Sequence, residues 1–317
     1  MGLINYIRKI STEHETWALA IRKKADKPLY LGNASDFHLL NRSGRYWRAD
    51  PFLVKYKNKN YVFCEMYDRK LGRGVIGVAK VAGNKVGHFR VCLKLPYHLS
   101  YPYVFEENGI VYMIPECCES GKVSMYKCVH FPDKWEYYKE ISDSPCVDTT
   151  PVYDDKISYF AAIFDEINGG NDNLCLIDNV GKVRKVKVND PFVRPAGALI
   201  RNEKLIRPSQ DCSITYGCGL FFNYVTDLSV ENYSEIPYLR ICPPGYECND
   251  NEVNVKVSGL SDRDCIIGIH TYNSNDDYEI IDVLLQEQKS FTVFWKNREK
   301  LFQYLKKRIV NRIKKKY

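Results

Sequence analysis

The 317-residue sequence contains no stretch of about 18 consecutive apolar residues, so it predicts no transmembrane helix of the usual length. Its first ten residues lack a long apolar core followed by a small-residue cleavage site, which argues against a secretory signal peptide. Its twelve cysteines include no CxxC pair and show no metal-ligand spacing with histidine. We therefore expect a cytoplasmic protein with reduced thiols and no metal site, with a disulfide-bonded secreted form as the alternative.

The formal net charge of the chain is +7, but most of the chain has no excess of positive charge. Residues 296–317 contain ten Lys or Arg and one Glu, a balance of +9, so residues 1–295 carry +7 − 9 = −2. A basic body would have indicated nucleic-acid binding. A slightly acidic body does not, and we expect no nucleic-acid partner.

The basic segment at residues 296–317 also has a helical pattern. Apolar residues recur at near-helical spacing from just before this segment and along it, at Phe294, Leu301, Leu305, Ile309 and Ile313. This pattern predicts a basic amphipathic helix, within a tail at residues 288–317, that is suited to lie on an anionic membrane surface. We therefore expect a peripheral protein on the inner face of the membrane. A helix packed on the main body and a nucleic-acid patch are the alternatives.

Linkers and low-complexity segments are also missing from residues 1–287, which we interpret as one domain. This domain contains an internal repeat with a period near fifty residues, which is typical of solenoids and propellers. Each copy has a strand, a polar turn and a second strand. The four copies read ADPFLVKYKNKNYVFCE, SYPYVFEENGIVYMIPE, VDTTPVYDDKISYFAAI and PAGALIRNEKLIRPSQD, starting at Ala49, Ser100, Val147 and Pro195.

A third strand follows each copy, and a fifth, weaker unit covers residues 266–273 and 278–285. The strand that this unit lacks is available near the N-terminus, around Trp17–Ile21. Strands from both ends of the chain would then close the ring and remove its open edges. The sequence therefore predicts an all-β fold, a five-bladed β-propeller over residues 1–287, followed by the basic amphipathic helix.

Acidic residues recur at two positions of the repeat. The first position holds Asp50, Tyr101, Asp148 and Ala196, at steps of 51, 47 and 48 residues. The second position, fifteen residues further on, holds Glu65, Glu116, Ile163 and Asp211. Because the first strand of each propeller blade lines the central channel, we expect the first set to share one rim with the turn at residues 194–196. The second set should lie near that rim or one layer outside it.

Clustered carboxylates perturb one another's pKa values, and such sets either carry out acid–base chemistry on glycosidic bonds or hold sugar hydroxyls without reaction. An acid after a strand can also simply cap a turn. Arg194 and Arg207 either pair with these acids or hold a phosphate or carboxylate. His270, from the fifth unit, is either a ligand contact or a packing residue. The abundant aromatic residues, 24 Tyr, 14 Phe and 4 Trp, suit both strand packing and stacking on sugars.

Several motifs, taken in order, resemble one known family. They are WRADPFLV, YVFCEMYD, GVIGVA, HLSYPYVFEENGIVYMIPE, RPAGALI and RPSQDCS. Over about residues 15–285 the chain resembles the propeller domain of plant glucosamine inositolphosphorylceramide transferases. Similar domains are joined to sugar formyltransferases in bacteria. That domain is in turn similar to the five-bladed propellers of glycoside hydrolase families 43, 32 and 68.

The resemblance implies roles for individual residues. In those hydrolases the Asp of a first-blade Asp-Pro pair is the base or nucleophile, and Asp50 matches it. A second Asp in the third blade tunes charge and binds substrate, and Asp148 matches it, although Thr149 replaces the usual Pro. Family 43 has a general-acid Glu at the head of blade four, where this chain has RPAG at residues 194–197. HTY at residues 270–272 stands where the relatives carry a His-His pair.

We therefore expect a membrane-associated glycosyltransferase of surface-glycan assembly (O-antigen, capsule or glycolipid). It would use an activated sugar, either a sugar nucleotide or a lipid-linked saccharide, although no familiar nucleotide-sugar motif occurs. Asp50 would deprotonate the acceptor hydroxyl, and Arg194 and Arg207 would neutralise the leaving phosphate. The expected catalytic residues are Asp50, Asp148 and Glu116, and the expected substrate-binding residues are Glu65, Tyr101, Arg194, Arg207, Asp211 and His270. The alternatives are a glycoside hydrolase with Glu116 as its acid, and a sugar-binding propeller without catalysis.

Overall fold

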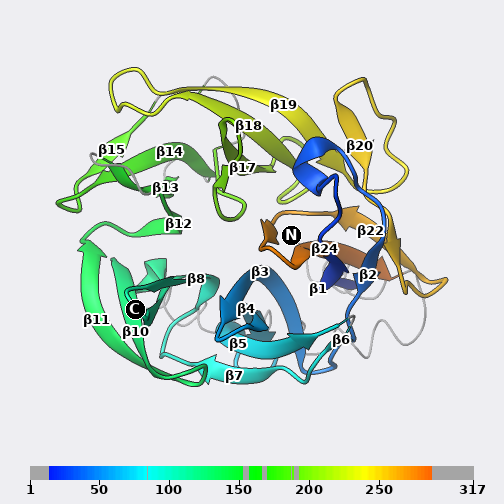
Figure 1. The fold of residues 1–317 in the computed structure, drawn as a ribbon, viewed down its shortest axis with the longest axis horizontal. Helices are drawn as coiled ribbons and strands as arrows, with labels where there is room; N and C mark the ends of the chain where they lie inside the picture. The colour runs from blue at the N-terminus through cyan, green and yellow to red at the C-terminus, as the bar shows by residue number, and fades with distance from the viewer. Residues whose placement is uncertain are drawn as a thin grey trace, which may run out of the picture.

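A computed structural model describes residues 14–83, 85–152, 157–165, 170–186, 188 and 193–287. Within these residues the chain forms five mainly antiparallel sheets around a common centre (Figure 1). The helical structure in the same residues is limited to two 3-10 helices, η1 (Leu29–Leu31) and η2 (Cys118–Ser120). The prediction of an all-β, five-bladed propeller is therefore confirmed. The expected amphipathic helix and the tail at residues 288–317 lie outside the described residues.

The first four blades follow one another along the chain, each numbered from its inner strand outwards. Blade 1 contains β3 (Tyr46–Tyr56), β4 (Lys59–Asp68), β5 (Arg73–Ala82), β6 (Lys85–Val86) and β7 (Arg90–Leu93). Blade 2 contains β8 (Ser100–Glu107), β9 (Ile110–Glu116), β10 (Val123–His130) and β11 (Lys134–Ser142). Blade 3 contains β12 (Cys146–Pro151), β13 (Ile157–Asp165), β14 (Gly170–Asp178) and β15 (Val183–Lys185). Blade 4 contains β16 (Ile200–Arg201), β17 (Leu205–Asp211), β18 (Gly219–Asp227), β19 (Ser234–Cys242) and β20 (Glu252–Asn254).

Blade 5 is built from both ends of the described chain. It contains β1 (His14–Lys23), β2 (Phe37–Leu39), β21 (Val257–Ser258), β22 (Asp264–Gly268), β23 (Tyr272–Ser274) and β24 (Tyr278–Glu287). Strand β1 pairs with β24 without interruption, from His14 opposite Glu287 to Lys23 opposite Tyr278. The expected contribution of the segment around Trp17–Ile21 is thus confirmed, and this pairing closes the ring.

The inner strands of blades 1, 2 and 3 share a local irregularity at the first repeat position. Their pairing registers shift at residues 49–52, 100–103 and 147–150. At these bulges Asp50, Tyr101 and Asp148 adopt φ values of 50°, 42° and 53°, in the left-handed region that residues other than glycine rarely occupy. Bulges re-aim side chains next to functional sites. The repeat therefore encodes a backbone distortion at this position, and two of the three blades place a carboxylate there.

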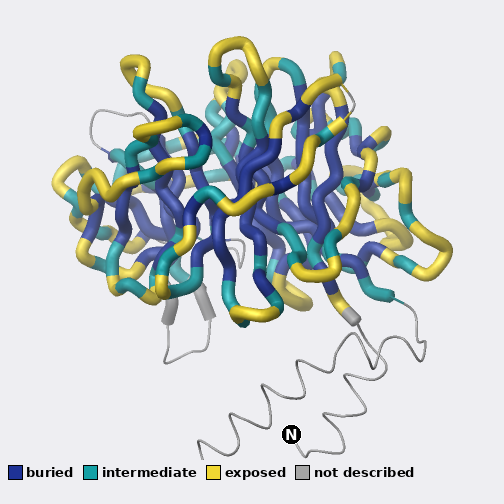
Figure 2. The backbone as a smooth tube through the Cα atoms, turned by 90° about the horizontal axis from the view of Figure 1, so that it is seen from below, coloured by how far each residue is buried: buried dark blue, intermediate teal, exposed yellow. Residues whose placement is uncertain are grey.

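Apolar side chains fill the spaces between neighbouring blades, and buried segments run through the centre while most exposed ones lie in the turns and outer strands (Figure 2). One cluster joins blades 4 and 5 through residues such as Phe222, Ile241 and Ile281. Another joins blades 2 and 3, with Ile114 and Met125 from blade 2 and Ile177 from blade 3 among its members. All twelve cysteines are unpaired. Among the described residues, no helix has the length and apolar character needed to cross a bilayer.

Candidate functional site

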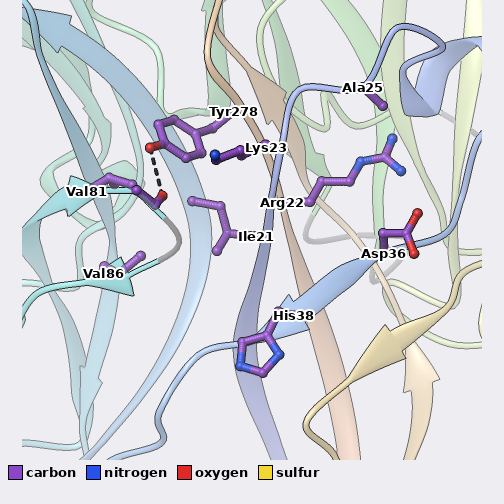
Figure 3. Close-up of a pocket in the computed structure, with 10 residues that line it drawn as sticks. Ile21, Arg22, Lys23, Ala25, Asp36, His38, Val81, Val86 and Tyr278 are labelled. Carbon is purple, nitrogen blue, oxygen red and sulfur yellow. Dashed lines mark hydrogen bonds between the residues drawn. The ribbon is translucent and has the colours of Figure 1, made fainter.

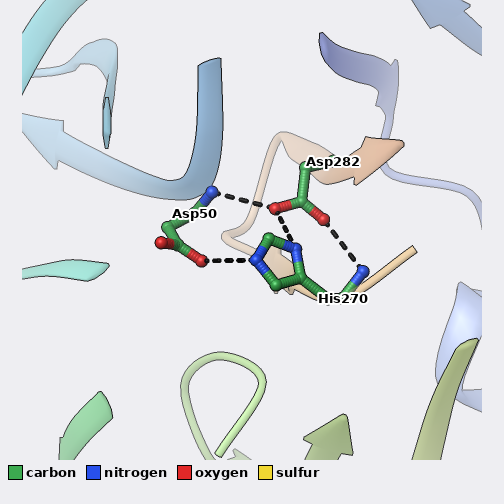
Figure 4. Close-up of side chains that lie close together, drawn as sticks. All are labelled: Asp50, His270 and Asp282. Carbon is green, nitrogen blue, oxygen red and sulfur yellow. Dashed lines mark hydrogen bonds and ion pairs between the residues drawn. The ribbon is translucent and has the colours of Figure 1, made fainter. Parts of the chain in front are cut away.

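A buried network of two carboxylates and one imidazole lies where blades 1 and 5 meet (Figure 4). Asp50 comes from the bulge of β3, Asp282 from β24, and His270 from the connection between β22 and β23. The Nδ1 atom of His270 lies 2.7 Å from Asp282 Oδ2, and its Nε2 atom lies 3.4 Å from Asp50 Oδ1. The imidazole is therefore held between the two carboxylates.

Backbone and hydroxyl groups fix both carboxylates. Asp282 Oδ1 accepts the backbone N–H groups of His270 and Thr271, at 3.0 and 2.9 Å. Asp282 Oδ2 accepts the backbone N–H of Asp50 at 2.9 Å. Asp50 in turn accepts the hydroxyl of Thr271 at 2.9 Å and the backbone N–H of Tyr101 at 3.2 Å. Asp282 thus sets the position of both the bulge and the imidazole.

The electrostatics of this network favour proton exchange near neutral pH. The pKa of Asp50 is raised to about 6. Burial is the largest cause, His270 opposes it, and the Asp282 and Asp148 carboxylates add to it. Burial lowers the pKa of His270, but the Asp282 and Asp50 carboxylates outweigh burial and raise it above the ordinary value. Asp50 is therefore mostly ionised at pH 7 and can still accept and release a proton, as a general base must.

Two aromatic rings cover His270. The half-buried ring of Trp17, on β1, stacks on the imidazole with centroids 4.0 Å apart. Tyr216 lies edge-on to it at 5.4 Å, and the Arg194 guanidinium lies 5.2 Å from the Tyr216 ring. Tyr216 is 49% exposed, so part of its ring remains available to a ligand. An exposed ring beside buried carboxylates suits a sugar, because pyranoses offer an apolar face and hydroxyl groups together.

A second carboxylate group lies at the bulge of blade 3. Asp148 Oδ2 accepts Arg194 Nε and Nη2, both at 2.7 Å, and Gln210 Nε2 at 3.2 Å. Burial raises the pKa of Asp148 above its ordinary value although Arg194 opposes this shift. Because Nε and Nη2 of Arg194 are used by Asp148, Nη1 remains the donor that can meet an anionic group of a substrate.

Tyr101 is fully buried and joins three blades. Its hydroxyl lies 2.9 Å from Thr150 Oγ1, donates to the Gly197 carbonyl at 3.2 Å and accepts the Gly197 N–H at 2.7 Å. Burial raises the pKa of Tyr101 well above its ordinary value, so its hydroxyl stays protonated. The substrate-binding role expected for Tyr101 remains a prediction, and the contacts that the structure gives it are with the protein itself.

Glu65, at the second repeat position, is buried and has one oxygen without a hydrogen-bond partner, Oε1. The imidazole of His98 lies beside it, with Nε2 3.4 Å from Oε1. Because the backbone N–H of Gly74 donates to His98 Nδ1 at 3.0 Å, Nε2 is the ring nitrogen that can donate toward Glu65. Burial, followed by repulsion from Asp50 and three further carboxylates, raises the pKa of Glu65 well above its ordinary value. Glu65 therefore keeps a proton to a higher pH than an exposed glutamate does.

Glu116 is more exposed than Glu65 and accepts hydrogen bonds at both oxygens. The Ser100 hydroxyl donates to Oε2, and the Cys118 N–H donates to Oε1 at 3.3 Å. A general acid must carry a proton to donate. Burial favours the protonated form of Glu65, and the role of general acid expected for Glu116 remains a prediction.

Asp211 and Arg207 are used in pairs that stabilise blade 4. Asp211 Oδ2 accepts Arg240 Nη2 at 2.6 Å, and Asp211 Oδ1 accepts the Ser213 N–H at 2.9 Å. Arg207, which is 1% exposed, donates from Nε to Glu235 at 2.7 Å. For Arg207 this is the structural alternative that the sequence had left open. The proposed site therefore rests on the other expected residues.

The three residues of Figure 4 also offer one possible metal-ligand atom each, all within 4.8 Å of one another. However, Asp282 already accepts three backbone N–H groups, and both imidazole nitrogens of His270 face carboxylates. A cation held by His270 Nε2 and Asp50 Oδ1 would take the place of the direct contact between these two atoms. In the structure these residues contact one another directly and form a network through which protons can be exchanged.

Sequence reasoning missed five residues of this site: Asp282, Trp17, Tyr216, His98 and Gln210. For Asp282 a signal was present, because YEIIDVLL places an acid inside an otherwise apolar strand, where an ionisable group needs a buried partner. Trp17 lies on β1, Gln210 lies on β17, and Tyr216 and His98 lie in connections between strands. The repeat pattern does not single out any of these four residues.

Comparison with known families gives a match over residues 41–177, to the family described as "Glucosamine inositolphosphorylceramide transferase 1, N-terminal". Curated relatives carry the same description. The chain is 31% identical to glucosamine inositolphosphorylceramide transferase 1 of Arabidopsis thaliana over 203 residues, which is 59% of this chain and 26% of that protein. The corresponding protein of Oryza sativa subsp. indica is 31% identical over 204 residues, 60% of this chain and 27% of that protein. The chain thus spans about a quarter of the length of these relatives.

Solved structures show the same fold at low identity. The catalytic domain of a Coprinopsis cinerea GH62 alpha-L-arabinofuranosidase has a TM-score of 0.55 and 11% identity, covering 84% of this chain and 97% of that one. The alpha-L-arabinofuranosidase of Podospora anserina, in complex with cellotriose, has a TM-score of 0.51 and 8% identity, covering 81% and 96%. The expected relation to glycosidase propellers is confirmed at the level of the fold.

Proposed function

Because residues 41–177 match the glucosamine inositolphosphorylceramide transferase 1 N-terminal family, we propose that this chain is a glycosyltransferase that acts on a glycolipid or related surface glycan. The observation that carries the proposal is Asp50, a buried carboxylate with a pKa of about 6, placed by a bulge beside His270. It lies in a network whose edge carries the exposed ring of Tyr216 and the Arg194 guanidinium.

The proposed reaction assigns each group one task. Asp50 accepts the proton of the acceptor hydroxyl while the acceptor oxygen attacks the anomeric carbon of the donor sugar. The bond from that carbon to the phosphate oxygen breaks, and the phosphate leaves with the bonding electron pair. Arg194 Nη1 meets the leaving phosphate, and His270, held by Asp282, favours the ionised form of Asp50 that accepts the proton. A departing phosphate needs little protonation, so the missing carboxylate at the head of blade 4 is compatible with transfer.

A sugar nucleotide or a lipid-linked saccharide would supply the donor. The basic segment at residues 296–317 would hold the chain at an anionic cytoplasmic membrane face, where lipid-linked substrates are found. Glycoside hydrolysis is the second candidate, and the observation in its favour is Glu65. Hydrolysis of a glycosidic bond requires an acid and a base, and Glu65, whose pKa is raised well above its ordinary value, would be the acid beside Asp50 as the base.

The test is a thermal-shift screen of the full chain against two panels, followed by turnover assays. One panel contains nucleotide sugars and lipid-linked sugar phosphates, and the other contains free oligosaccharides. A ligand of the folded state at about 100 times its Kd adds about 2.7 kcal/mol of stability. Transfer predicts a shift with the first panel, and a turnover that Asp50→Asn lowers by about 10²–10⁴-fold without abolishing binding.

Asp250→Asn is the control. It makes the same change of charge as Asp50→Asn, but at an exposed residue away from the network. A shift with free oligosaccharides alone, together with their cleavage, would instead establish hydrolysis. Binding of oligosaccharides without turnover in either assay would leave a sugar-binding propeller.

A further inference from the structure

A basic groove lies outside the sugar site, at the outer boundary between blade 5 and blade 1. It consists of two adjoining cavities of about 520 and about 630 Å³ that share His38 and Val86. The first is drawn in Figure 3, where the end of β1, strand β2 and the β5–β6 turn form its walls. Its size is in the range of small-molecule sites.

Among the charged and titratable side chains that line this groove, basic ones predominate. Lysine, arginine and histidine reach it from separate segments: Arg22, Lys23, His38, Arg42, Arg48, Lys85 and His88. The single acid in its lining is Asp36. Convergence of cations from both blades on one depression creates a site for an anion.

Two of these cations are already neutralised. Arg22 pairs with Glu279 at 2.7 Å, and Arg42 pairs with Asp264 at 2.8 Å. Within the part of the chain that the structure describes, no carboxylate lies at ion-pair distance from Lys23, Arg48 or Lys85. The groove therefore keeps a net positive charge after its internal pairs are counted.

Arg48 is the most informative of the three, because it is partly buried. Its Nη1 donates to the Asn41 carbonyl at 2.7 Å, and its guanidinium lies 4.4 Å from the centre of the Phe89 ring. Its Nε is buried without an acceptor. Burial lowers the pKa of Arg48. Burying part of a cation without a counter-charge costs free energy, and an anionic ligand in the groove would remove that cost.

We propose that this groove binds a phosphate-bearing ligand at a site separate from the channel site. Arg48 supplies planar donors that match phosphate oxygens, and Lys23 and Lys85, both exposed, supply mobile point charges on opposite walls. The phosphate can belong to a soluble phosphate ester or to a lipid headgroup. These two sources share the same recognition chemistry and differ in the assay that detects them.

The experiment uses the full chain and two probes, inorganic pyrophosphate by calorimetry and phosphatidylcholine vesicles with or without phosphatidic acid by co-sedimentation. The variant Lys23→Glu/Lys85→Glu changes only exposed side chains and should weaken binding by roughly tenfold or more. Lys182→Glu, an equally exposed change on blade 3, is the control and should bind as wild type does. Comparison with this control separates the groove from any other basic segment of the chain.

Loss of pyrophosphate binding in the double variant identifies a site for soluble phosphate esters, and loss of phosphatidic-acid dependence alone identifies a lipid headgroup. Arg48→Met is a second variant, which should lose probe binding while keeping or gaining thermal stability, because it removes an uncompensated cation. The proposal is overturned if neither probe distinguishes the double variant from Lys182→Glu, or if Arg48→Met loses stability and retains binding.

Discussion

Replacing Arg194 by Met should destabilise the protein in a way that depends on pH. Arg194 makes two contacts of 2.7 Å with Asp148, and the two side chains are 13% and 3% exposed, so solvent screens the pair little. The variant leaves Asp148 buried with Gln210 Nε2, at 3.2 Å, as its remaining side-chain donor. Removing one partner of such a buried pair costs about 3–5 kcal/mol. We expect this loss at pH 8.

The loss should shrink as the pH falls. Burial already raises the pKa of Asp148 with Arg194 present, and removing the cation raises it further. Between the unfolded pKa of about 3.9 and this raised value, the native protein binds more protons than the unfolded chain, so its stability declines as the pH rises. Urea unfolding at pH 5 and pH 8 measures the difference, with Asp148→Asn/Arg194→Met as the control. An equal loss at both pH values, or no recovery in the double variant, would refute this reasoning.

Two further substitutions test Glu65 and the backbone. Glu65→Gln should raise the free energy of unfolding at pH 8 by about 1 kcal/mol or more and change it little near pH 4.5, because it removes a group whose raised pKa costs stability as the pH rises. Melting temperatures measured across this pH range test the prediction, and an effect that does not depend on pH would contradict the raised pKa of Glu65. Gly197→Ala should prevent folding, because Gly197 has a φ of 132° and a Cβ there would lie 1.9 Å from the Tyr272 carbonyl oxygen. Gly245 has a φ of 87° but open space around it, so Gly245→Ala should lower the free energy of unfolding, measured by chemical denaturation, by only about 1–2 kcal/mol. Similar losses at the two glycines would show that the close approach is relieved.

The sequence predicts the propeller because the information is periodic. Residues at similar steps along the chain, such as Asp50, Tyr101 and Asp148, occupy equivalent bulges in the structure. The third strand expected after each copy of the repeat is found, as β5, β10, β14 and β18. The outermost strands were not predicted, because their side chains are largely exposed and show no clear apolar pattern, as in β11.

The site was predicted only where it follows the repeat. Asp50 and His270 were expected and lie in the network, and Asp148 was expected and lies in the second carboxylate group. However, the network depends on Asp282, whose partners are 232 and 12 residues away in the chain. Arg207 and Arg194 are alike in sequence context, and only the fold shows that one pairs with Glu235 and the other with Asp148. Such pairings depend on which strands become neighbours across blades.

The closure of blade 5 by β1 and β24 has a consequence for synthesis. Asp282, which anchors the bulge at Asp50 and the imidazole of His270, belongs to the last described strand, so the growing polypeptide lacks it until almost the whole propeller has been translated. Long-range pairings of this kind form late in folding. An unfinished polypeptide on the ribosome therefore has neither a closed ring nor an organised Asp50, and it gains both in the same step.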